Sequence, residues 1–179
     1  MRDLIPTYIA TRAELFATEA NIATATYGLH PTPSELLDDL YLRRLHQAMF
    51  DRVRRWAGRY RPREANIGID PADIGVQVRA LAGDATSWVA NASFDLDELA
   101  ARFRHRLVQT HPFDNGNGRH GRVAADLLIR SLGRPVFGWG RGLDLETGEL
   151  RRRYKRALQA MDSNPDDVGS LITFARSRS

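Results

Sequence analysis

Residues 111–122 read His111-Pro112-Phe113-Asp114-Asn115-Gly116-Asn117-Gly118-Arg119-His120-Gly121-Arg122, and a mostly apolar run follows at 123–129. Glycines at 116 and 118 allow the backbone positive φ angles and a close approach to a ligand. The change from this segment to a periodic apolar run predicts a loop that becomes a helix. The first amides of a helix lack intrahelical partners, and together with the helix dipole they attract phosphates.

The charged side chains of this segment suit such a ligand. Arg119 and Arg122 are three positions apart and therefore share a face of the predicted helix. Arginine contacts phosphate oxygens in a bidentate manner. Pro112 disfavours a helical conformation for His111, so the histidine should lie in the loop, available as a general base. The residues therefore predict a phosphate site with a base beside it.

The spacing resembles the signature of the Fic (filamentation induced by cAMP) family, His-x-Phe-x-(Asp/Glu)-Gly-Asn-(Gly/Lys)-Arg-x-x-Arg. Every fixed position matches except residue 115, where asparagine replaces the family's acid. Residues 65–70, which read Ala65-Asn66-Ile67-Gly68-Ile69-Asp70, and the Asn-Gly-Asn-Gly-Arg-His form of the motif resemble a bacterial subgroup called mobile mystery protein B. That subgroup is encoded beside a helix-turn-helix protein, so the resemblance implies such a partner.

Fic proteins transfer AMP from ATP to a hydroxyl of a target protein, and the resemblance implies this reaction here. His111 would take the proton of a Ser, Thr or Tyr hydroxyl. The other matching residues would contact the triphosphate, and these are Gly116, Asn117, Gly118, Arg119 and Arg122. Arg119 would bind the β-phosphate region and Arg122 the γ-phosphate. The expected ligands are ATP as substrate and Mg²⁺.

Position 115 is the departure from the family, whose acid there binds Mg²⁺. Magnesium prefers carboxylate oxygens, and an amide oxygen brings no charge, so Asn115 should weaken metal binding. Three outcomes follow: a working transferase with weaker metal binding, a site for a different phosphate ligand, or a silent chain that only binds. The favoured outcome is the working transferase. The alternative is a nucleotide- or partner-binding module of a toxin–antitoxin-like pair.

A segment ahead of the motif is expected to contact the target. The resemblance implies a β-hairpin flap at residues 65–75, which would pin the target peptide by strand addition. Its contact residues would be Ile67, Gly68 and Ile69. Asn66 to Ile69 is short and β-like, and a plain connecting loop is the alternative interpretation.

A helix predicted at residues 11–27 is the candidate inhibitory segment. In many Fic proteins a glutamate of such a helix pairs with the second motif arginine. Glu19 is the candidate here, and Glu14 is the second choice. Leu15 and Ala20 depart from the family's inhibitory pattern, (Ser/Thr)-x-x-x-Glu-(Gly/Asn), and an ordinary exposed helix glutamate is an equal alternative.

Apolar periodicity predicts helices through most of the remaining chain. They are expected at residues 11–27, 32–57, 72–91, 96–109, 144–161 and 168–176, with the motif loop and helix at 111–132. His46, in the second of them, is expected to be structural. Residues 1–179 are thus predicted to form one all-α domain, a Fic-type helical bundle with a short β-hairpin.

Composition excludes several other classes. The chain has no cysteine, which rules out disulfides and thiolate metal sites and fits a cytoplasmic location. No apolar run approaches the roughly 18 residues of a membrane helix, and no signal peptide is expected. The net charge of +4 allows a nucleic-acid binder. The arginines are spread along the chain without matching exposed aromatics, which disfavours nucleic-acid binding as a third possible function.

Overall fold

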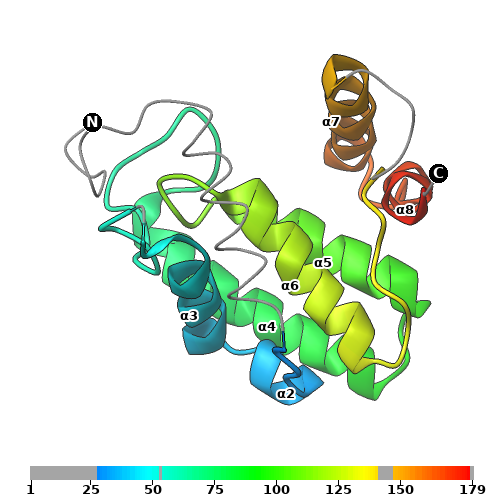
Figure 1. Ribbon diagram of the computed structural model, residues 1–179, viewed down its shortest axis with the longest axis horizontal. Coiled ribbons are helices and arrows are strands. Elements are labelled where there is room, and N and C mark those ends of the chain that lie inside the picture. The colour runs from blue at the N-terminus through cyan, green and yellow to red at the C-terminus, as the bar shows by residue number, and fades with distance from the viewer. Residues whose placement is uncertain (1–27, 53, 141–146, 178–179) are drawn as a thin grey trace.

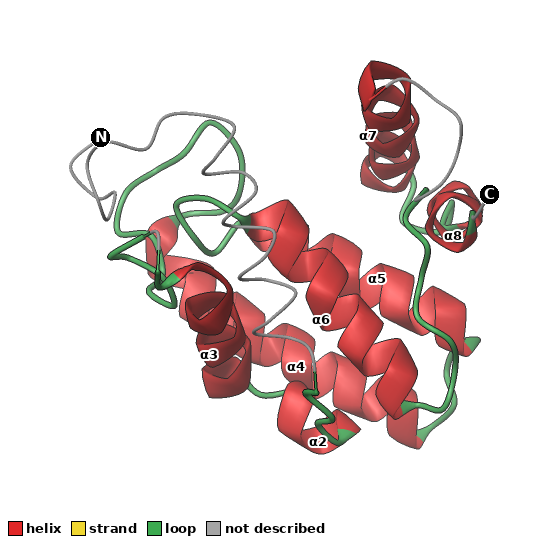
Figure 2. Ribbon diagram, in the orientation of Figure 1, coloured by secondary structure: helices red, strands yellow, loops and turns green. Residues whose placement is uncertain are grey.

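The computed structural model describes residues 28–52, 54–140 and 147–177. These ranges contain seven α-helices and one 3-10 helix but no strand (Figures 1 and 2), so the all-α prediction is confirmed. The elements are α2 (Pro33–Leu36), α3 (Asp39–Phe50), η1 (Pro71–Asp73), α4 (Ile74–Ala90), α5 (Leu96–Thr110), α6 (Asn117–Ser131), α7 (Thr147–Ser163) and α8 (Gly169–Arg176).

Helices α5 and α6 form the largest contact between elements in the described chain. Figure 1 shows them side by side, with α2 and α3 on one side and α7 and α8 on the other. Leu107 of α5 and Leu128 of α6 belong to the core that they share with α2, α3 and α4. Gly121 permits the close approach of α6, because a Cβ there would lie 2.7 Å from the Val108 Cγ2 atom. This pairing places the motif loop at one end of the core.

The single helix predicted at residues 32–57 is wrong, because the segment forms two helices. Thr32 and Glu35 make a capping box that starts α2. The Asp38 side chain then accepts a hydrogen bond from the Tyr41 amide and starts α3 separately. Apolar periodicity runs across the junction because residues on both sides of it are buried, so the pattern hid the break. The remaining predicted helices within the described ranges are confirmed to within a few residues.

The β-hairpin expected at residues 65–75 is not present, because the described chain there is a loop followed by η1. The buried side chain of Arg61 closes this loop in place of a ladder between strands. Its Nη1 donates to the Arg63 carbonyl at 2.8 Å, and its Nη2 donates to the Ile69 carbonyl. A guanidinium thus satisfies carbonyls that a second strand would otherwise need to pair.

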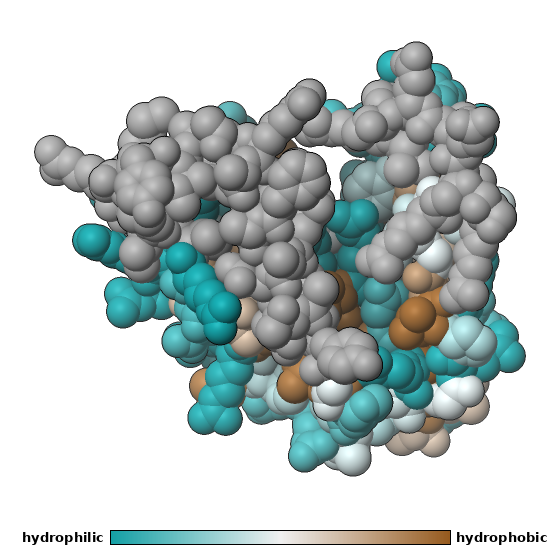
Figure 3. Space-filling view, viewed as in Figure 1, coloured by the Kyte–Doolittle hydropathy of each residue, from teal (hydrophilic) through white to brown (hydrophobic). Residues whose placement is uncertain are grey.

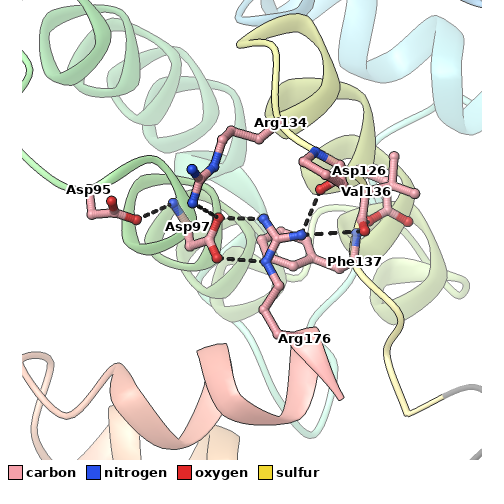
Figure 4. Close-up of polar contacts among 8 residues, drawn as sticks. Asp95, Asp97, Asp126, Arg134, Val136, Phe137 and Arg176 are labelled. Carbon is pink, nitrogen blue, oxygen red and sulfur yellow. Dashed lines mark hydrogen bonds and ion pairs between the residues drawn. The ribbon is translucent and has the colours of Figure 1, made fainter. Parts of the chain in front are cut away.

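A polar cluster fixes the C-terminal helix against α5 (Figure 4). Arg176 of α8 donates from Nε to Asp97 Oδ2 at 2.6 Å and from Nη2 to Asp97 Oδ1, and its Nη1 donates to the Pro135 carbonyl. The hydrogen bonds from Arg176 lower the pKa of Asp97. Asp126 of α6 accepts a hydrogen bond from Trp139 Nε1 at 2.9 Å. The loop after α6 is therefore held in place, and the side chain of its Trp139 is buried.

The predicted inhibitory helix at 11–27, with Glu19 and Glu14, lies outside the described residues. None of the described helices is both long and apolar enough to cross a membrane. The coloured part of the face in Figure 3 is mostly hydrophilic. The large apolar side chains most exposed among the described residues are those of Leu40, Ile67 and Val76.

Candidate functional site

A cavity of about 290 Å³ lies at the N-terminal end of α6. Its wall is made by His111, Asp114, Asn115, Gly116, Asn117, Gly118, Arg119, Arg122 and Tyr154. All of these except Tyr154 belong to the motif. The fold therefore brings the predicted base and the predicted phosphate-binding residues to one hollow.

The shape of the motif loop depends on Gly116. Its φ is +83°, and a Cβ at this position would lie 2.6 Å from Phe50 Cζ. Gly118 differs from the expectation, since it lies in the first turn of α6 and does not adopt positive φ. A Cβ on Gly118 would meet no atom within 4 Å, so this glycine instead leaves open space at the helix start.

Asn117 uses its side chain to close the loop. Its Oδ1 accepts a hydrogen bond from the Phe113 amide at 3.0 Å, and its Nδ2 donates to the Phe113 carbonyl at 2.7 Å. Sequence reasoning expected this side chain at the phosphates. Both polar atoms of the side chain are instead used to hold the loop. Only the backbone amide of Asn117 is left to face a ligand at the helix start.

The start of α6 has the properties of an anion site. No described side chain caps the helix. Its first residues, Asn117, Gly118 and Arg119, line the cavity, and Arg122 joins them from the next turn. Uncapped amides and the positive end of the helix dipole favour negative charge at this place, and two guanidinium groups strengthen the effect.

His111 lies where the predicted base should lie. It ends α5 in a left-handed conformation, with φ +50° and ψ +57°. Its Nδ1 is buried, and no described residue forms a hydrogen bond with it. Burial, and to a smaller extent the charge of Arg61, lower the pKa of this histidine below its usual 6.5. The imidazole is therefore neutral at physiological pH and able to accept a proton.

The three residues predicted to contact a target come close to this histidine. A Cβ on Gly68 would lie 2.5 Å from the His111 Cβ. Ile69 is tied to the same place, because Arg61 hydrogen bonds both its carbonyl and that of His111. Ile67 projects outward with 64% of its surface exposed. The segment thus forms an open edge beside the base.

Asn115 and Asp114 are the metal-ligand candidates. Asn115 Oδ1 accepts a hydrogen bond from the Gly116 amide at 2.7 Å, while the exposed Asp114 lines the same cavity. The described residues contain no cluster of three or more His, Asp, Glu or Cys side chains that could hold a metal. Mg²⁺ commonly takes one or two carboxylates together with substrate phosphates. The donors present fit a magnesium ion held largely by the phosphates of a ligand.

His46 has a larger part in the site than its sequence position indicated. It is fully buried, and its Nδ1 accepts a hydrogen bond from the Gly58 amide at 3.0 Å. Its Nε2 therefore carries the proton and donates it to the Asn115 carbonyl, also at 3.0 Å. The ring stacks on Phe113 with centroids 3.7 Å apart. Helix α3 thus supports the motif loop through one neutral imidazole. No local sequence pattern predicts this contact, because the two residues are far apart in the chain.

Comparison with known proteins matches residues 36–129 to the Fic/DOC family. The N-terminal FIC domain of Bep8 from Bartonella sp. 1-1C has a TM-score of 0.73 and 16% identity, over 96% of this chain and 87% of that one. BepC from Bartonella tribocorum, solved with bound AMPPNP, has a TM-score of 0.66 and 20% identity, over 92% and 88%. A putative cell filamentation protein from Bartonella quintana, solved with ADP, has a TM-score of 0.68 and 18% identity, over 95% and 86%. These structures share the fold.

Proposed function

Because the chain belongs to the Fic/DOC family, we propose that it transfers AMP from ATP to a Ser, Thr or Tyr hydroxyl of a target protein. One observation supports this most: His111, the uncapped start of α6, Arg119 and Arg122 surround a single cavity. Neighbouring structures that hold AMPPNP and ADP support a nucleotide as the ligand.

The proposed reaction begins at His111. Its neutral imidazole takes the proton of the target hydroxyl, and the oxygen attacks the α-phosphorus of ATP. The bond from the α-phosphorus to the bridging oxygen breaks, and pyrophosphate leaves with the electron pair. AMP becomes joined to the target through a phosphodiester bond.

Charge stabilisation would come from the start of α6. The backbone amides of Asn117 and Gly118, at the uncapped start of the helix, would contact the α-phosphate oxygens, where negative charge grows in the transition state. Donors fixed in advance in this way are each worth roughly 3 kcal/mol. Arg119 and Arg122 hold the β- and γ-phosphates and thereby select the phosphorus that is attacked. When bound, Mg²⁺ supplies further positive charge at the phosphates, and Asp114 and Asn115 are the residues that would hold it.

Residues 67–69 are proposed as the target-binding segment. They are next to His111 and carry the exposed Ile67. An extended peptide running along this edge would bring its hydroxyl toward the imidazole, and the side chain of Ile67 would add apolar contact. This assignment does not require the hairpin that sequence analysis expected.

A binding module without catalysis is the second candidate, because Asn115 lacks the charge of the family's acid. Incubation with labelled ATP and Mg²⁺ or Mn²⁺ separates the two functions. Label on protein that disappears in His111→Ala supports the transferase. ATP binding without label on any target would refute the transferase and support the module.

Partner, location and regulation are proposed from the sequence alone. Membership of the mobile mystery protein B subgroup would give the chain a helix-turn-helix partner and a place in the cytoplasm. Co-purification of this chain with the product of an adjacent helix-turn-helix gene tests the pairing. Glu19 is proposed to inhibit through Arg122, so Glu19→Gln should increase automodification with ATP. Unchanged automodification would remove that proposal.

A further inference from the structure

Arg104 of α5 is a buried cation for which no described residue provides a hydrogen-bond acceptor. It has no exposed surface, and its Nε, Nη1 and Nη2 atoms all lack such a partner among the described residues. Its guanidinium instead lies over two aromatic rings, 4.8 Å from the centroid of Tyr154 and 5.4 Å from that of Trp139. Cation–π contacts recover only part of the cost of burying a charge.

The electrostatic surroundings of Arg104 are also unfavourable. Burial is the largest cause that lowers its pKa, to about 9, and the charge of Arg122 adds to it. No carboxylate of the described chain offsets these two effects. A buried charge without an opposite charge is among the costliest arrangements in a protein, so its retention calls for a counter-ion from elsewhere.

The cavity is the place where that negative charge would arrive. Tyr154 and Arg122 both line the cavity, and Arg104 lies over the ring of Tyr154 and within electrostatic reach of Arg122. An anion at the start of α6 would therefore act on Arg104 across one layer of side chains. Because Arg104 itself is fully buried, the attraction is screened less than between charges on the surface.

We propose that Arg104 is a specificity-determining residue whose counter-ion is the bound polyphosphate, so that the site selects ligands by their negative charge. The inference rests on the proposed nucleotide function and goes beyond it, since Arg104 lies outside the motif and does not line the cavity. Arg104 then favours a triphosphate over a diphosphate and a diphosphate over a monophosphate. Tyr154 keeps water from the guanidinium and so preserves the effect.

Binding of inorganic tripolyphosphate, pyrophosphate and phosphate to the full chain tests this directly by calorimetry. Arg104→Met and Arg104→Gln remove the charge and keep most of the volume. For two unit charges separated by about 10 Å in a medium with an effective dielectric constant of about 20, each unit of ligand charge changes the affinity roughly tenfold. Because tripolyphosphate carries more than one negative charge in excess of phosphate, both variants are expected to reduce the preference for tripolyphosphate over phosphate by at least about tenfold. The same measurement with ATP, ADP and AMP should give the same order.

Arg106→Met is the matched control on the same helix. Arg106 also lies over an aromatic ring, that of Trp88, but it is paired with Asp84 at 2.7 Å and partly exposed. Its loss should leave the preference within twofold, although the net charge falls by the same amount. Equal preference in wild type and both Arg104 variants would overturn the proposal.

Thermal unfolding of the ligand-free variants is measured first. The proposal expects both to fold, because they lose a charge that no described residue compensates. Failure of both variants to fold would overturn the proposal, since the contacts of Arg104 with the two aromatic rings would then be needed for folding. A wild-type chain that selects tripolyphosphate but never labels a protein contradicts the transferase alone. Variants that keep the wild-type preference, in a chain that does label protein, contradict the Arg104 inference alone.

Discussion

Gly68 lies directly against His111, so close that a Cβ on Gly68 would stand 2.5 Å from the His111 Cβ. The same atom would lie 2.9 Å from Arg61 Nη2 and 3.2 Å from the Thr110 carbonyl. The φ of Gly68 is +101°, in a region that residues with side chains rarely adopt. Glycine at this position therefore lets the proposed target-binding segment rest on the proposed base.

Gly68→Ala should reduce transfer to protein at least tenfold, because the added methyl must push the loop away from His111. The positive φ adds a cost of about 1–2 kcal/mol to folding. Labelled-ATP assays give the first effect and urea unfolding gives the second. Gly133→Ala is the control, since Gly133 has φ +80° but a Cβ there would meet nothing within 4 Å. Equal losses of transfer in the two variants would show that the contact with His111 is irrelevant.

The pH dependence of transfer should follow the ionisation of His111. Burial and Arg61 lower its pKa, so the neutral base persists below pH 6.5. The value of kcat/KM should fall only as the pH drops through this lowered pKa, which places the midpoint of the acid limb below 6.5. Arg61→Gln removes one cause of the shift and should move the midpoint upward. A wild-type midpoint above 6.5 would contradict the assignment.

Metal dependence should respond to position 115. Asn115→Asp adds a carboxylate to the cavity wall and is expected to lower the Mg²⁺ concentration for half-maximal transfer by about tenfold. Asp114→Asn should raise that concentration, because it removes the carboxylate already lining the cavity. Asn91→Asp, at an exposed residue after α4, controls for the added charge. No change in either cavity variant would exclude these residues as metal ligands.

Two buried histidines should make the fold sensitive to acid. Burial is the main cause that lowers the pKa of His46 to about 3 and that of His120 to about 4, whereas in the unfolded chain both are near 6.5. Between these values the unfolded chain binds more protons, so the stability conferred by the neutral rings is complete above pH 6.5 and declines below it. Each histidine contributes up to about 1.4 kcal/mol per pH unit.

Urea unfolding at a series of pH values measures this decline. His46→Gln removes one titrating group and should make the dependence of the unfolding free energy on pH less steep. Asn91→Gln, at an exposed position without a titrating side chain, should leave the steepness unchanged. An unfolding free energy that is constant from about pH 7 to about pH 5 would show that the histidines are not held neutral.

The helices and the motif were accessible to sequence reasoning because their signals are local. Apolar periodicity marks the buried faces of α4, α5 and α6. The glycine of the loop, the proline after the base and the arginines of α6 act within one or two helical turns of each other. Their order along the chain therefore predicted the loop, the helix and the general position of His111. The break at Asp38 is also local, and its capping signal was hidden by continuous apolar spacing.

The sequence by itself thus determined an all-α chain, and it placed the motif loop at the start of one helix. Only the tertiary structure decided what surrounds that loop. His46 reaches the Asn115 carbonyl, Arg61 holds the loop where a hairpin was expected, and Tyr154 lines the cavity and packs against Arg104. Each of these contacts joins residues on separate elements, and burial of Arg104 results from the packing of α5 against its neighbours. Periodicity and capping report on neighbours along the chain, whereas desolvation and charge pairing depend on which distant side chains the fold brings together.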